Sequence, residues 1–120
     1  MLLAMKARMR YAEHRPYAVP DRLEELTGPT GGLVSLPIHL DWSGTRRPYD
    51  LRDAAERNIM YERVLREAAG SQDLHRYLNA EVLLKVWQDL YLPPQVRAAW
   101  ERRFPQLAHR RHVVARGPIS

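Results

Sequence analysis

His39 and Asp41 combine residue types and a spacing that could support proton transfer. A carboxylate beside an imidazole can orient the ring as a general base. If this segment is a strand, side chains two residues apart project from one face, so the two groups would lie together. The sequence places no serine, cysteine or third ligand that would complete a site. The simpler interpretation is a solvated hydrogen-bonded pair, and we predict no catalytic residue.

Two other motifs lack residues that their chemistry would need. The glycine-rich stretch 28–32 resembles a phosphate-binding loop in composition, but Leu33 follows it where a lysine and a Ser/Thr are required. His109 and His112 could hold a metal ion on a helix, but no carboxylate joins them and Pro105 argues against a helix there. We therefore expect neither a cofactor nor a metal ion.

The segment around His39 has the alternating pattern of a half-buried strand. Pro37 cannot donate a hydrogen bond to a neighbouring strand, so residues 33–42 are predicted to form an edge strand with Pro37 facing outward. The apolar residues recur at every second position, and they are Val34, Leu36, Ile38, Leu40 and Trp42.

A single strand needs a partner, because unpaired backbone donors and acceptors are costly beside a buried apolar face. A small internal hairpin or ribbon would provide one. The other candidates are the N-terminal arm, residues 112–116, the same strand in a second copy of the chain, and another protein by strand addition. The sequence leaves these alternatives open.

Helices are predicted over most of the remaining chain. The longest spans 51–69, where apolar residues recur at intervals of three and four. Asp50 is suited to cap this helix, and Ser71 and Asn79 are suited to cap the two helices that follow it. Shorter helices are expected over 21–26, 71–78, 80–91 and 94–104.

The last two predicted helices meet at Pro93 and Pro94, which end the first helix and begin the second. Two helices around a tight break resemble a DNA-binding helix-turn-helix, whose second helix exposes polar residues such as Arg97 near its start. The break has two prolines where such a turn often has glycine. A short helical hairpin that packs Trp87 against Trp100 explains the same residues.

These patterns predict a helix-dominated α+β fold with four to five short helices and one edge strand, or a small two-stranded ribbon. The 120 residues suit one domain, and 45% apolar residues suffice for a buried core. We expect an N-terminal arm over 1–19, a helical domain over 20–107 and a basic tail over 108–120. The absence of cysteine suits a reducing cytoplasm, and no apolar run reaches the roughly 20 residues of a membrane span.

The net charge of +5 is concentrated in the two ends, because residues 1–20 and 100–120 are basic whereas 21–99 is slightly acidic. Basic ends can contact phosphates or an acidic protein surface. A nucleic-acid binder usually has a basic face on its folded body, so we expect only weak nucleic-acid binding through the ends.

Several motifs together resemble a known group of proteins. They are LTGPTGG, an apolar strand ending in LDWSG, MYERVLREA, DLHRYLNAE and DLYLPP, which lie between about Asp21 and Leu107. This order is similar to that of short uncharacterised actinobacterial proteins, whose genes often adjoin one for a nucleotidyltransferase-like toxin of the abortive-infection type. The resemblance implies a protein partner and an antitoxin role, and it transfers no catalytic residue.

The leading hypothesis is a non-enzymatic interaction protein that binds and restrains such a toxin. The alternative is a DNA-binding transcriptional regulator with a helix-turn-helix-like C-terminal half, and an enzyme comes third. A homodimer formed through the strand is a further hypothesis, and no membrane partner is expected. The predicted interaction residues are His39, Asp41, Trp42, Arg97, Arg102 and Arg103.

Overall fold

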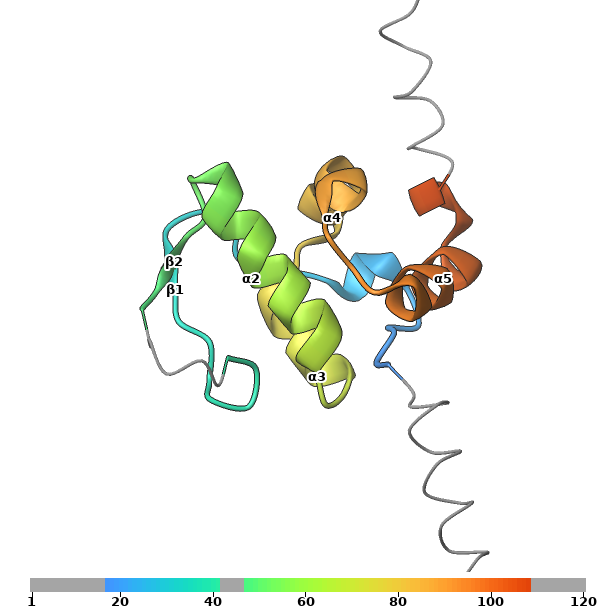
Figure 1. Ribbon diagram of the computed structural model, residues 1–120, viewed down its shortest axis with the longest axis horizontal. Helices are drawn as coiled ribbons and strands as arrows, with labels where there is room; N and C mark the ends of the chain where they lie inside the picture. The colour runs from blue at the N-terminus through green and yellow to red at the C-terminus, as the bar shows by residue number, and fades with distance from the viewer. Residues whose placement is uncertain (1–16, 42–46, 109–120) are drawn as a thin grey trace, which may run out of the picture.

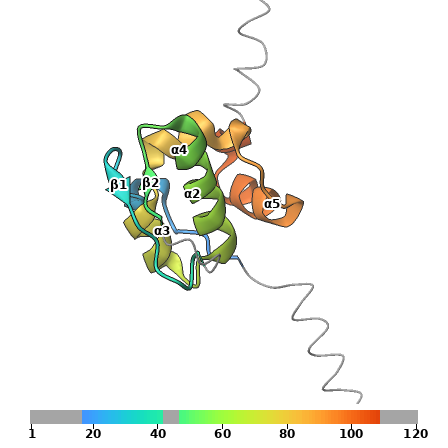
Figure 2. The ribbon, with the colours of Figure 1, turned by 60° about the vertical axis from the view of Figure 1, so that its left-hand side comes forward.

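Helix α2, Ala54–Glu67, lies at the centre of the fold, and the other elements are arranged around it (Figure 1). The computed structural model describes residues 17–41 and 47–108. A two-stranded antiparallel ribbon lies on one side of α2 and helix α5 on the other, as two views show (Figures 1 and 2). The predicted helix-dominated α+β fold is confirmed.

The remaining elements are short. Within the described ranges, no helix combines the length and the apolar character that crossing a bilayer requires. In chain order, the elements are the 3-10 helix η1 (Leu23–Glu25), β1 (Leu33–Val34), β2 (Tyr49–Asp50), α2, α3 (Ser71–Tyr77), α4 (Ala80–Val86), the 3-10 helix η2 (Trp87–Asp89) and α5 (Pro94–Arg103).

The strand predicted over 33–42 is wrong in its extent. Only Leu33 and Val34 form β1, and they pair antiparallel with β2 in the internal ribbon that was one of the predicted alternatives. The backbone carbonyl of Pro37 accepts hydrogen bonds from the backbone N–H groups of Leu40 and Asp41, both at 3.0 Å. This local turn replaces the ladder, because Pro37 has no N–H to donate to it.

The turn also breaks the predicted apolar face. Leu40 is fully buried, whereas the side chain of Ile38 is 64% exposed. Val34 and Leu36 are half-buried against the core. Trp42, most of the predicted N-terminal arm and nearly all of the basic tail lie outside the described residues.

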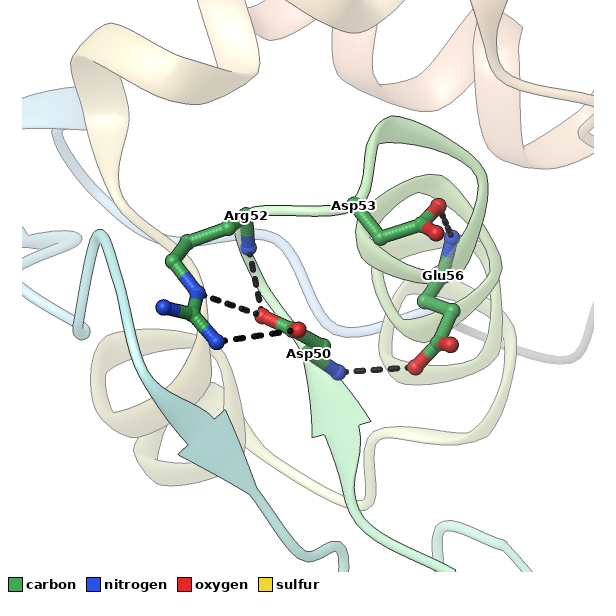
Figure 3. A network of polar contacts seen from close by, with 4 residues as sticks. All are labelled: Asp50, Arg52, Asp53 and Glu56. Carbon is green, nitrogen blue, oxygen red and sulfur yellow. Dashed lines mark hydrogen bonds and ion pairs between the residues drawn. The ribbon is translucent and has the colours of Figure 1, made fainter.

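The start of α2 is fixed by side chains around the preceding loop (Figure 3). Asp53, and not the predicted Asp50, is the N-cap, and its carboxylate accepts hydrogen bonds from two N–H groups of the first turn. The Glu56 carboxylate reaches back to the Asp50 N–H at 2.8 Å. Asp50 cannot cap the helix because its backbone belongs to β2. Hydrogen bonds from the Arg52 side chain and backbone hold the pKa of Asp50 below its ordinary value.

The predicted packing of Trp87 against Trp100 across the two prolines is confirmed. The ring centroids of Trp87 and Trp100 lie 6.0 Å apart, and those of Trp100 and Phe104 lie 5.9 Å apart. Val96 is buried on the same face of α5. Tilted aromatic pairs at these distances are favourable beyond the area they bury, so this cluster anchors the C-terminal part of the core.

Asn79 joins three parts of the chain. As predicted, its side-chain oxygen caps α4, accepting from the N–H groups of Glu81 and Val82 at 3.0 and 3.2 Å. Its side-chain amide donates to the Gly28 carbonyl at 3.3 Å, and its backbone N–H donates to the Tyr61 hydroxyl at 3.0 Å. One residue therefore links α4 to α2 and to the segment that follows η1.

Gly28 lies in contact with the backbone at the end of α3. Its N–H donates to the Leu78 carbonyl at 2.8 Å, and a Cβ atom at this position would lie 2.6 Å from the carbonyl carbon of Tyr77. Real Cβ atoms do not approach backbone this closely, so the position requires glycine.

We expect Asn79→Ala to lower the free energy of unfolding by about 2 kcal/mol, because it removes both the helix cap and the amide bond to Gly28. Urea unfolding followed by tryptophan fluorescence measures the loss.

Ser71→Ala is the matched control. Ser71 was predicted to cap α3, but Gly70 occupies the N-cap position and no side chain caps this helix. The control should change the free energy of unfolding by no more than about 0.5 kcal/mol. Equal losses in the two variants would contradict the role given to Asn79.

Candidate functional site

The five predicted interaction residues that the structure describes do not form one cluster. His39 and Asp41 lie in the loop that follows β1, whereas Arg97, Arg102 and Arg103 lie in or at the end of α5. The ribbon and α5 are on opposite sides of α2 (Figures 1 and 2).

His39 and Asp41 do not form the predicted pair. The His39 Nε2 atom lies 3.0 Å from the Asp73 carboxylate near the start of α3. The Asp41 carboxylate instead accepts a hydrogen bond of 2.6 Å from the Tyr49 hydroxyl. The two side chains take different partners because the turn after Pro37 ends the strand geometry on which the predicted pairing depended.

Asp41 is a buried carboxylate, with 8% of its surface exposed. The Arg63 guanidinium of α2 lies 3.5 Å from it and supplies the opposite charge. A buried charge is tolerated only when it is paired and hydrogen-bonded, and Asp41 has both kinds of partner. The contact ties the loop that follows β1 to the central helix.

Burial and the hydrogen bond to Asp41 raise the pKa of Tyr49 above its ordinary value. Both effects favour the protonated phenol, since a buried tyrosinate beside a carboxylate would be poorly solvated and repelled. Tyr49 is in β2, so its hydroxyl connects the ribbon to the same loop.

A hollow of about 430 Å³ opens beside this buried group. Apolar side chains form much of its wall, with a hydroxyl and two charged groups among them. The exposed side chain of Ile38 contributes to the wall, and Leu33 of β1, nearby in the sequence, is 66% exposed. The lining residues are Ser35, Leu36, Pro37, Ile38, Asp41 and Arg47.

Arg97 is used inside the fold. Its guanidinium donates to the backbone carbonyl of Leu90 at 2.6 Å and to that of Trp87 at 3.4 Å. It also lies 5.1 Å from the centroid of the Trp87 ring and 3.7 Å from the Glu101 carboxylate. Arg97 therefore holds the end of η2 against α5, and its side chain is not presented to a partner.

Arg102 and Arg103 are exposed at the end of α5. The Arg103 guanidinium donates to the Asp21 carbonyl at 3.1 Å and lies 3.5 Å from the Asp21 carboxylate. Arg102 has no hydrogen-bond or ion-pair partner among the described residues, so of the three predicted arginines it is the one left available to a partner.

The sequence interpretation missed Tyr49 and Arg63. Arg63 lies within the long predicted helix, yet its guanidinium reaches the buried Asp41 of a distant loop. Spacing within a helix gives no signal for a contact to a loop over twenty residues away. Tyr49 follows the loop. It could have been found by asking which residue after the loop pairs with β1.

The comparisons with known proteins give no identification. No protein-family model, no curated protein and no solved structure matches the chain.

We expect Leu40→Asp to lower the free energy of unfolding by several kcal/mol, about 3 or more, because it buries a charge without a partner. The same substitution two residues earlier, Ile38→Asp, should cost less than about 1 kcal/mol, since Ile38 is exposed. Urea unfolding of both variants tests the difference, and equal costs would restore the predicted strand face.

The raised pKa of Tyr49 predicts a loss of stability in alkali. The folded protein holds the phenolic proton more tightly than the unfolded chain, so this contribution is present below the ordinary value near 10 and is lost as pH rises through the folded pKa. Titration of ring-labelled tyrosines by NMR should give Tyr49 a lower pKa in Asp41→Asn than in the wild type. Tyr61, whose pKa burial also raises, is the internal control and should not move. A Tyr49 pKa unchanged by Asp41→Asn would contradict the hydrogen bond.

Proposed function

We propose that the protein is a non-enzymatic binding partner of another protein, with an antitoxin-like role toward a nucleotidyltransferase-type toxin. The observation that carries the proposal is the exposed Ile38, which stands in the wall of the hollow instead of in the core. The identity of the partner comes from the resemblance of the sequence motifs.

Exposed apolar side chains support a protein-binding surface on this side of the molecule. Single exposed apolar residues are common, but Leu33 and Ile38 are both nearly two-thirds exposed and belong to one short segment beside a hollow. Covering them with a partner would stabilise a complex through burial of apolar surface. The ribbon of two strands also offers an edge to which a partner strand could be added.

The alternative of a DNA-binding regulator has less support. A reading helix must present polar side chains to the bases, and Arg97 at the start of α5 is used by backbone carbonyls and Trp87. Contacts to phosphates through the basic ends would give binding that falls steeply with salt. A tight complex with a preferred duplex site at physiological salt would favour the regulator instead.

Co-expression with the product of the adjacent gene tests the proposal. That product alone should slow growth, and this protein should relieve the effect and co-purify with it at a fixed stoichiometry. The double variant Leu33→Ser, Ile38→Ser should lose co-purification, because it removes the exposed apolar surface.

Ile59→Ser is the matched control, since Ile59 is also an exposed isoleucine, at 44%, but lies on α2. It should co-purify like the wild type. A harmless neighbour, or two proteins that never co-purify, would reject the antitoxin role. Loss of binding in both variants would place the contact elsewhere.

A further inference from the structure

The charges that line the hollow do not cancel. The Arg63 guanidinium lies 3.5 Å from the Asp41 carboxylate and balances its charge, while the Tyr49 hydroxyl donates to it at 2.6 Å. Arg47 is exposed at the hollow, and among the described residues no carboxylate lies within ion-pair distance of it. Counting the described residues alone, the hollow therefore carries the unbalanced positive charge of Arg47.

The polar and apolar parts of the lining favour one kind of ligand. The Arg47 guanidinium and the Ser35 hydroxyl can both donate hydrogen bonds to an anionic oxygen. Leu36, Pro37 and Ile38 supply an apolar wall next to these donors. A phosphate backbone would satisfy the donors but would leave the apolar wall uncovered, whereas a peptide with neighbouring acidic and apolar side chains would satisfy both.

We propose that the hollow binds a short segment of a partner protein in which an Asp or Glu is flanked by bulky apolar residues. The carboxylate pairs with Arg47, and an apolar side chain covers Ile38 and Leu36. A volume of about 430 Å³ is large enough for side chains of this size. This inference rests on the proposed function as a binding protein and names the chemistry of the partner at its surface.

The lining is prepared for such a ligand before it binds. Leu40 is fully buried, and the Asp41 carboxylate is tied to α2 and β2, so the backbone beside the hollow is fixed at this point. A fixed surface loses little conformational entropy on binding, which favours recognition of a short segment.

The test uses the full chain labelled with ¹⁵N and three blocked peptides, N-acetyl-Leu-Glu-Leu-amide, N-acetyl-Leu-Lys-Leu-amide and N-acetyl-Ser-Glu-Ser-amide. At millimolar peptide, the first should shift the amide resonances of residues 35, 36, 38–41 and 47. The second should bind roughly tenfold more weakly or not at all, because it brings a like charge to Arg47. The third should also bind more weakly, because it cannot cover the apolar wall.

Charge reversal separates this proposal from general attraction to a basic protein. Arg47→Glu should lose binding of the Leu-Glu-Leu peptide and gain binding of the Leu-Lys-Leu peptide. Arg102→Glu makes an equal charge change at an exposed residue of α5, so this variant should bind the peptides like the wild type. Both variants should keep the wild-type free energy of unfolding, since Arg47 and Arg102 are exposed.

Three results would overturn the proposal. They are no shift with any peptide, equal binding of the Glu and Lys peptides, and equal loss of binding in the two arginine variants. A short DNA duplex that produces the same shifts, with binding that falls steeply with salt, would assign the hollow to phosphate instead. Because no toxin is present in this experiment, peptide binding can succeed where co-purification fails, and the two proposals can be rejected independently.

Discussion

The fold depends on the close approach of the segment after η1 to the end of α3, which Asn79 and Gly28 make possible together. Asn79 satisfies the first N–H groups of α4, the Gly28 carbonyl and, through its backbone, the Tyr61 hydroxyl of α2. Gly28 lets the two backbones meet, because any side chain there would collide with Tyr77. The Ala80 N–H donates to the Leu26 carbonyl at 3.0 Å and extends the same junction. This junction therefore fixes the segment after η1 and the start of α4 against the end of α3.

Helix α2 then positions both flanks of the molecule through two consecutive residues. The Glu62 carboxylate accepts the backbone N–H of Tyr91 at 2.8 Å and holds the connection to α5. The next residue, Arg63, reaches the buried Asp41 on the other side. Consecutive residues of a helix point about 100° apart, so one turn of α2 can contact both the ribbon side and the α5 side.

Features set by neighbouring residues could be predicted from the sequence, and features set by long-range contacts could not. Asn79 as a cap, the apolar face of α5 and the packing of Trp87 against Trp100 depend on local spacing and short turns, and all three are present. The strand prediction was wrong in its extent because alternation at every second residue gives no sign that Pro37 interrupts the ladder. The Pro37 carbonyl accepts the hydrogen bonds of a local turn instead. The buried pairing of Asp41 with Arg63 and Tyr49 joins separate elements, and no pattern within one element encodes it.

The ion pair between Asp41 and Arg63 fixes the position of the loop after β1 but adds little to the stability of the fold. Removing two charges from water costs free energy that their attraction only partly returns, so such a pair adds little net stability. Most of the stabilisation must come from apolar burial, and the two buried tryptophans and Phe104 lie in the part of the core built by η2 and α5.

The loop that carries Ile38 is on the opposite side of α2 from α5 (Figures 1 and 2). Because the aromatic core lies elsewhere, this loop can keep apolar side chains exposed without loss of the fold, and the buried pair fixes the geometry in which a partner meets them.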